Sequence, residues 1–227
     1  MPTTHRVLHL VGSPSGPKSR TRAVAEHFIA AYQRLRPGVQ VETMDAWQED
    51  LPPFDAEMIE AKFAVLRKQQ ATPAQRALWN RAVQLARRFN AADLYVLSVP
   101  MWNYGVPYRM KHLIDVLTLP EENWRWTPST GYQALLHGKR AVVAYSSAGA
   151  YPLEVRAGST DHQKGFVRDW LAFVGIRDVL ELNVAPTLAP PTDVAATLEA
   201  SRHQAEDLAR RLAQEPAPRP ARAHLSE

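Results

Sequence analysis

The sequence contains no cysteine, and this absence excludes disulfide bonds, thiolate metal ligands and a cysteine nucleophile. Long apolar runs are missing as well. The first apolar stretch, residues 7–11, is too short for the core of a signal peptide, and no stretch has the length of a membrane-spanning helix. We therefore expect a cytoplasmic protein that does not enter a membrane. The chain also lacks a G-x-G-x-x-G motif, which argues against a Rossmann dinucleotide site.

The composition fits a single α/β domain with a sizeable core, because 45% of the 227 residues are hydrophobic. The formal net charge is +4 and arginines are scattered along the chain, so we expect attraction for anionic ligands but no nucleic-acid partner. Several of the 18 prolines lie close to the C-terminus. We therefore predict one domain over residues 1–214 and a disordered tail over residues 215–227.

Five short apolar segments alternate with helical patterns, which predicts a parallel sheet covered by helices on both faces. The predicted strands are residues 6–11, 39–44, 94–99, 140–145 and 179–184. The predicted helices cover residues 19–35, 56–68, 74–89, 160–174 and 192–214, and another begins near residue 107. Thr192 is the predicted N-cap of the last helix, and Gly175 is placed to end the helix before it. A long excursion separates residues 120 and 138.

The natural arrangement of five such strands is a flavodoxin-like three-layer sandwich with strand order 2-1-3-4-5. In that order, the loops after the first, third and fourth strands converge at one edge of the sheet, where open α/β sheets bind ligands. These loops are residues 12–18, 101–105 and 146–151.

The loop after the third strand is the most informative stretch of the chain. It reads Met101, Trp102, Asn103, Tyr104, Gly105 and lies between a strand stopped by Pro100 and a helix that starts near Pro107. The aromatic side chains offer flat apolar surface. Gly105 would let the backbone approach a ligand closely or take a left-handed conformation. The combination suits a planar heteroaromatic ring with polar edges, although an aromatic packing loop would have the same composition.

The loop after the first strand nearly matches the P-loop pattern G-x-x-x-x-G-K-[ST]. Pro17 stands where a glycine is needed, and proline removes an N–H and fixes φ, so a nucleoside triphosphatase is disfavoured. The helix N-terminus that follows presents Ser19, Arg20 and Thr21, which suit one phosphate monoester. The plainer interpretation is an N-cap at Ser19 and a surface charge at Arg20.

The loop after the fourth strand contains only small residues at its start: Ser146, Ser147, Ala148 and Gly149. Small side chains let backbone groups meet the edge of a ring, although an ordinary turn could have this composition. A site for one phosphate, an aromatic loop and a small-residue loop at a single edge of the sheet suit a mononucleotide with a large planar ring. FMN is the obvious candidate.

These residues resemble a known family. The segment Pro100-Met-Trp-Asn-Tyr-Gly-Val-Pro107 and the following Met110-Lys-His-Leu-Ile-Asp115 are similar to the flavin loop of FMN-dependent NADH-azoreductases, part of the NAD(P)H:quinone oxidoreductase group. Ser13 and the Ser19-Arg20-Thr21 element are similar to the family's phosphate loop. The resemblance extends over residues 6–214. Where azoreductases often have Ser-Arg-Gly-Gly, this chain has Ser146-Ser-Ala-Gly149.

The resemblance implies that residues 101–105 and 146–149 contact the isoalloxazine ring and that two subunits build each site, which makes a homodimer. It also implies a two-electron ping-pong reaction, in which NADH or NADPH reduces FMN and a quinone or azo compound then takes the electrons. The flavin carries the chemistry, so neither a catalytic side chain nor a metal is required.

Further aromatic residues are candidates for substrate binding. Tyr151 follows the third loop, and Trp124 and Trp126 lie in the excursion, where they either cap the flavin pocket or pack the excursion onto the domain. His112 and His162 could act as general acids, but solvated helix residues are the more ordinary interpretation. Two other functions stay open: a flavodoxin-type electron carrier without turnover and an FMN-binding regulatory protein.

Overall fold

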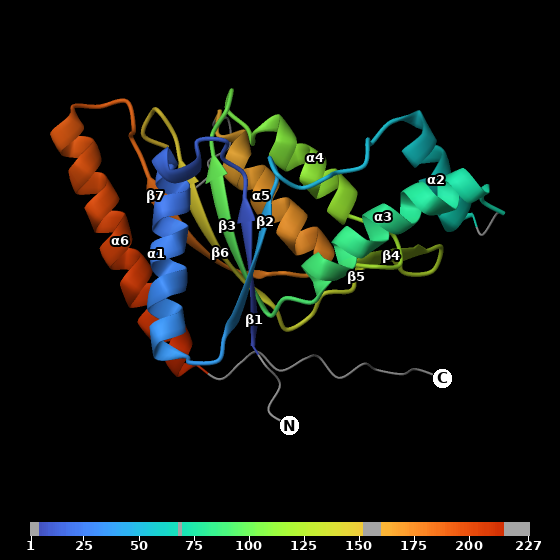
Figure 1. The fold of residues 1–227 in the computed structure, drawn as a ribbon, viewed down its shortest axis with the longest axis horizontal. Helices are drawn as coiled ribbons and strands as arrows, with labels where there is room; N and C mark the ends of the chain where they lie inside the picture. Colours follow the sequence, from blue (N-terminus) through green and yellow to red (C-terminus); the bar gives the residue numbers. More distant parts are fainter. Residues whose placement is uncertain (1–4, 68–69, 152–159, 216–227) are drawn as a thin grey trace.

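A five-stranded parallel sheet forms the centre of the molecule (Figure 1). The computed structural model describes residues 5–67, 70–151 and 160–215. The strand order is β2-β1-β3-β6-β7, which confirms the predicted order 2-1-3-4-5 once the two strands of a separate hairpin are counted. The five strands are β1 (Arg6–Val11), β2 (Gln40–Asp45), β3 (Leu94–Pro100), β6 (Arg140–Ser146) and β7 (Asp178–Val184).

Helices cover both faces of the sheet and make the predicted three layers (Figure 1). Helices α1 (Arg20–Leu35) and α6 (Pro191–Gln214) pack together on one face. The other face carries α4 (Tyr108–Leu117) and α5 (His162–Val174), with α3 (Pro73–Asn90) beside them. Helix α2 (Ala56–Leu66) packs on α3 at the outer end of this layer.

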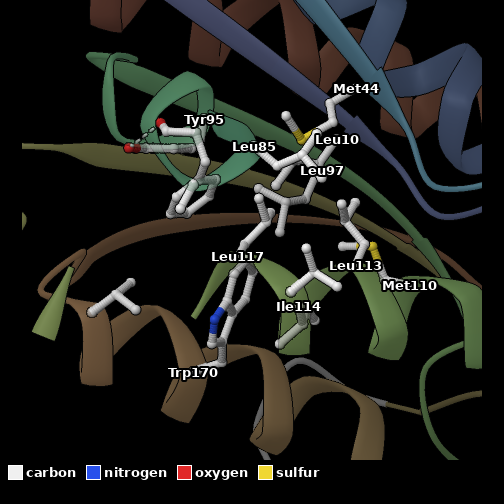
Figure 2. Packing of buried hydrophobic residues seen from close by; sticks show 14 of the residues in the cluster. Leu10, Met44, Leu85, Tyr95, Leu97, Met110, Leu113, Ile114, Leu117 and Trp170 are labelled. Atoms are coloured by element: carbon white, nitrogen blue, oxygen red, sulfur yellow. Dashed lines mark hydrogen bonds between the residues drawn. The ribbon is translucent and has the colours of Figure 1, made fainter. Parts of the chain in front are cut away.

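The central strand β3 is apolar because it is buried on both faces, and all its residues except Pro100 are buried. Leu94 and Val96 join the hydrophobic cluster under α1 and α6. Tyr95, Leu97 and Val99 join the larger cluster under α3, α4 and α5, part of which Figure 2 shows. The helix predicted to begin near residue 107 is α4, and it buries one apolar face: Met110, Leu113, Ile114, Val116 and Leu117.

The excursion at residues 120–138 contains a β-hairpin that the sequence did not reveal. Strand β4 (Trp124–Thr127) pairs antiparallel with β5 (Gly131–Ala134). Each strand has four residues, too few for an alternating pattern to stand out. The hairpin lies beside α3, α4 and α5, away from the edge of the sheet where β3 ends (Figure 1).

The start of α6 corrects one prediction. The helix begins at Pro191, with Pro190 at the N-cap position and no side-chain cap, so Thr192 lies inside the first turn. Proline suits this position because its φ already has a helical value and its missing N–H is not needed there. The predicted tail lies outside the described residues, except for Glu215.

A buried polar pair links the two central strands. His9 of β1 and Ser98 of β3 are 2% and 0% exposed, and their Nε2 and Oγ atoms are 2.7 Å apart. Burial, with a smaller contribution from the positive charge of Arg22, lowers the pKa of His9 from 6.5 to about 4. The imidazole is therefore neutral in the folded protein at physiological pH, which suits its place between the two strands.

The pKa of His9 predicts a pH dependence of stability. Below pH 6.5 the unfolded chain binds a proton at this residue, whereas the folded protein does so only near pH 4, so stability falls as the pH falls through this interval. We expect wild type to lose about 2 kcal/mol more unfolding free energy than His9→Gln between pH 7 and pH 5. Glutamine keeps the hydrogen-bonding capacity without titrating. Denaturant titrations at both pH values measure this, and equal losses in the two proteins would contradict the prediction.

Gly175 ends α5 with φ of 109°, as the sequence predicts for a terminating glycine. A Cβ atom at this position would lie 2.1 Å from the carbonyl oxygen of Leu136. Leu136 joins the excursion to α5, because its N–H donates to the carbonyl of Val174. We expect Gly175→Ala to lower the unfolding free energy by at least about 2 kcal/mol, because strain and a backbone clash act together.

Gly165, inside α5, is the matched control, since a Cβ atom there would meet nothing within 4 Å. Gly165→Ala should be neutral or stabilising by up to about 1 kcal/mol, because alanine favours a helix interior. Thermal and denaturant unfolding of both variants test the contrast.

Candidate functional site

The three predicted loops meet at the carboxyl edge of the sheet, and backbone hydrogen bonds join them. The N–H of Gly12, where the first loop begins, donates to the carbonyl of Ser98 in β3 over 2.9 Å. The N–H of Met101, where the aromatic loop begins, donates to the carbonyl of Ser146 over 2.7 Å. Parallel pairing of β1, β3 and β6 thus continues into the loops and aligns their starting points.

The aromatic loop is a tight two-residue turn. Trp102 and Gly105 exchange both of their backbone hydrogen bonds, over 2.9 and 3.0 Å. The central residues Asn103 and Tyr104 have φ values of 47° and 68°, as in the primed turns that connect tight hairpins. The expectation for Gly105 is wrong in one respect: its φ is not positive, and a Cβ atom there would meet only the carbonyl oxygen of Trp102, at 3.9 Å.

The turn leaves two aromatic rings open to solvent. Trp102 is 39% exposed and Tyr104 is 53% exposed, which is unusual for side chains of this size. Trp47 packs against Trp102 and Tyr108, with ring centroids 5.8 and 5.3 Å apart, and its Nε1 donates to the carbonyl of Gly12 over 3.1 Å.

Trp47 combines a packing role with a role in the loop cluster. The residue is half-buried and does pack on the core, but it also joins the first loop to the aromatic loop. A signal for this role was present: Trp47 follows the end of β2, and all parallel strands end at the same edge of the sheet.

The first loop carries a cluster of hydroxyl groups at the N-terminus of α1. Ser13, Ser19 and Thr21 are 5%, 5% and 0% exposed, and the hydroxyl oxygens of Ser19 and Thr21 are 3.1 Å apart. Ser19 is the N-cap of α1, because its Oγ accepts a hydrogen bond from the N–H of Arg22. Arg20 is exposed. The arrangement offers hydroxyls, the positive end of a helix dipole and nearby cations to one anion.

The same loop does not form the phosphate nest of a P-loop. Residues Gly16–Lys18 make a 3₁₀ turn in which the N–H of Lys18 donates to Ser15 and that of Ser19 donates to Gly16, over 3.0 and 3.1 Å. These N–H groups are used within the loop. The geometry therefore agrees with the sequence argument against a nucleoside triphosphatase.

Hydrogen bonds from the segment after β7 hold the third loop in place. Thr187 donates through its N–H and its hydroxyl to the carbonyl of Ser147, over 2.9 and 3.0 Å. Ser147 is buried and its hydroxyl donates to the carbonyl of Gly149, whereas Ala148 and Gly149 are exposed. The ring of Tyr151 lies 3.4 Å from the position of a Cβ atom on Gly149, so this tyrosine belongs to the same loop cluster.

Trp124 and Trp126 do not join the three loops. Trp124 is buried against Tyr132 and Phe173, with ring centroids 5.5 and 5.7 Å away, and it packs the hairpin onto α5. Trp126 is 51% exposed on the same hairpin. The two histidines considered as general acids have different surroundings. Nε2 of His112 is hydrogen-bonded to the carbonyl of Pro52 over 2.9 Å, whereas His162 has an exposed side chain at the start of α5.

Within residues 5–67, 70–151 and 160–215, no group of three or more His, Cys, Asp or Glu side chains is arranged to hold a metal ion. None of the helices in this part of the chain is both long and apolar enough to cross a membrane.

Comparison with known proteins agrees with the geometry. Residues 5–209 match a family model described as the flavodoxin-like fold. The FMN-dependent NADH:quinone oxidoreductase of Nitratidesulfovibrio vulgaris is 34% identical over 209 residues, which cover 92% of this chain and 98% of that protein. FMN-dependent NADH:quinone oxidoreductase 3 of Pseudomonas fluorescens is 36% identical over 214 residues, with 92% and 97% covered.

Solved structures show the same fold at lower sequence identity. The FMN-dependent NADH-azoreductase of Bacillus anthracis, in complex with FMN, has a TM-score of 0.81 at 23% identity, with 92% of this chain and all of that chain covered. An NAD(P)H:quinone oxidoreductase of Methanothermobacter marburgensis has a TM-score of 0.71 at 17% identity, with 92% and 100% covered. The chain belongs to the flavodoxin-like fold family and, within it, to the family of the FMN-dependent NADH:quinone oxidoreductases.

Proposed function

We propose that this protein is an FMN-dependent oxidoreductase that takes electrons from NADH and passes them to a quinone or an azo compound. The observation that carries the proposal is the meeting of two exposed aromatic rings, Trp102 and Tyr104, with a cluster of buried hydroxyls at one edge of the sheet. The names of the relatives support the cofactor and the donor, and they leave the physiological acceptor open.

The described residues fit FMN. Ser13, Ser19, Arg20 and Thr21 would hold the phosphate, because hydroxyls and a helix N-terminus are suited to one phosphate group. The isoalloxazine ring would lie against residues 101–105, with residues 146–149 along its other edge. Bound FMN supplies the two-electron redox chemistry, and the protein binds it, orients it and sets access to the ring.

The chain's own contribution to the reaction is positional. The backbone of residues 101–105 would meet the polar edge of the ring, while Trp102 and Tyr104 offer stacking surface to a flat second molecule. Tyr151 would border the same surface from the third loop. We propose that NADH and the acceptor occupy this surface in turn, as the ping-pong scheme requires.

The central test uses the purified protein, its released cofactor and NADH without oxygen. We expect FMN in mass spectrometry of the released cofactor, and rapid loss of its visible absorption when NADH is added. Addition of a quinone should then restore the absorption over repeated cycles. A flavodoxin-type carrier or a regulatory FMN-binding protein would retain its colour with NADH. FAD or no flavin would overturn the proposal altogether.

A groove whose lining includes none of the three loops supports the proposal of a homodimer. The groove has a volume of about 790 Å³ and lies between α2, α4, α5 and the hairpin. Four exposed apolar side chains line it: Phe63 (45%), Leu66 (37%), Tyr132 (67%) and Phe173 (37%). Trp126 (51%) is the cross-strand neighbour of Tyr132 on the hairpin. Lys62, Lys111, Asp115 and Asp169 also line the groove. A second copy of this chain would cover these exposed apolar side chains.

The homodimer also gives the hairpin tryptophans a place in the reaction. Trp126 is exposed, and the hairpin that carries it lies away from the loops of its own subunit (Figure 1). We propose that it borders the flavin loops of the partner subunit, where it would limit the shape of the acceptor. Trp124, which is buried, supports Trp126 by packing the hairpin onto Phe173.

A charge placed in the groove should separate the subunits. We expect Tyr132→Glu to shift the protein from dimer to monomer in sedimentation equilibrium, because a carboxylate in an apolar interface is costly to desolvate. Leu35→Glu is the matched control, since Leu35 is 48% exposed at the far end of α1. The control should remain dimeric. A monomeric wild type, or a dimeric Tyr132→Glu with an unchanged dissociation constant, would contradict the homodimer.

A further inference from the structure

The first turn of α5 contacts the aromatic loop directly. The backbone N–H of His162 lies 3.0 Å from the carbonyl oxygen of Tyr104 and 3.1 Å from that of Thr160, so it is shared between the two. One residue further on, Gln163 donates through Nε2 to the carbonyl of Val99, near the end of β3, over 2.9 Å. The helix therefore holds both the strand that leads into the loop and the tip of the loop.

This end of α5 is itself fixed by buried charges. The carboxylate of Asp161 accepts hydrogen bonds from the N–H groups of Gln163 and Lys164, each over 3.0 Å, and so caps the helix. Its other oxygen is 2.5 Å from Nζ of Lys164, and the two side chains are 2% and 0% exposed. Lys164 Nζ also reaches the carbonyl of Tyr151, at 3.5 Å. A buried ion pair adds little net stability, so its effect here is to fix geometry.

Tyr104 needs such support. A bulky residue with φ of 68° is disfavoured, because its Cβ crowds the following carbonyl group. Strained residues of this kind persist where the surrounding structure restrains them, and they gather at binding sites. The hydrogen bonds inside the turn close it, and the N–H of His162 restrains Tyr104 from outside the turn.

We propose that the backbone N–H of His162 is a positioning group for the flavin site. It holds Tyr104 in its left-handed conformation and so keeps the aromatic loop in the shape that receives the ring. The inference rests on the proposed function, because it assumes that this loop binds FMN. The role belongs to the backbone and not to the imidazole, which is exposed.

A proline at position 162 removes the N–H and leaves the helix intact. His162 is the first residue of α5, where proline is well accepted, and Asp161 has φ of −79° and ψ of 89°, outside the helical region that a following proline disfavours. His162→Ala is the matched control, because it removes the imidazole and keeps the N–H. We expect His162→Pro to bind FMN roughly three- to tenfold more weakly than His162→Ala, the effect of one hydrogen bond. The melting temperatures of the FMN-free proteins should be alike.

A second background tests whether the N–H acts through Tyr104. Tyr104→Gly creates an Asn-Gly pair at 103–104, which favours the left-handed turn without outside help. In this background, the ratio of FMN dissociation constants between His162→Pro and His162→Ala should shrink towards one. A ratio that persists would show that the N–H acts elsewhere, and it would overturn the proposal.

A side-chain variant gives an independent route to the same result. Lys164→Met removes the ion pair while keeping the length of the side chain, and Lys164→Arg is the conservative partner. Lys164→Met leaves the buried carboxylate of Asp161 without its cation, so we expect it to melt at a lower temperature than Lys164→Arg. At a temperature where both variants are folded, we expect the Met variant to bind FMN more weakly than the Arg variant. If His162→Pro and Lys164→Met both bind FMN as well as their controls, the positioning role is wrong. If wild type binds no FMN, the proposed function itself has failed.

Discussion

The pairing of β3 with β1 on one side and with β6 on the other is the constraint on which the site depends. Every loop of the candidate site leaves the sheet from one of these strands, and the hydrogen bonds of Gly12 and Met101 continue the ladder beyond them. A shift of one residue in either register would exchange the two faces of a strand. Because both faces of β3 are packed against helices, such a shift would also disrupt both hydrophobic clusters.

The aromatic loop combines two features that are unfavourable in isolation. Asn103 and Tyr104 have left-handed backbone conformations, and the rings of Trp102 and Tyr104 are exposed to solvent. A loop selected only for stability would have Asn-Gly at the turn and smaller side chains beside it. The surrounding structure restrains this loop through α5 and through Trp47. Such a conformation is expected where a flat ligand covers the rings and uses the exposed backbone.

Ion pairs with acidic side chains fix several of the basic side chains at the surface. Several arginines are held in ion pairs on the surface: Arg88 with Glu42 and Glu49, Arg140 with Asp178 and Glu215, and Arg168 with Glu181. Exposed pairs of this kind add little to stability individually. The pairing does not change the formal net charge of +4, which already counts the acidic partners.

The sequence by itself determined the five parallel strands, their order and the loops that meet at the sheet edge, because buried strands appear as short apolar segments and parallel strands end on one side. It also indicated Ser19 as an N-cap and Gly175 as a helix end, which are local features. Only the tertiary structure decided the left-handed turn at Asn103 and Tyr104, the short hairpin and the contact of His162 with the loop. The contact of His162 joins residues far apart in the chain. The hairpin strands are too short for an alternating pattern to stand out, and Tyr104 is a residue type that rarely adopts a positive φ. The N-cap predicted at Thr192 was wrong, because the neighbouring Pro190 and Pro191 begin the helix earlier in the chain than the polar residue indicated.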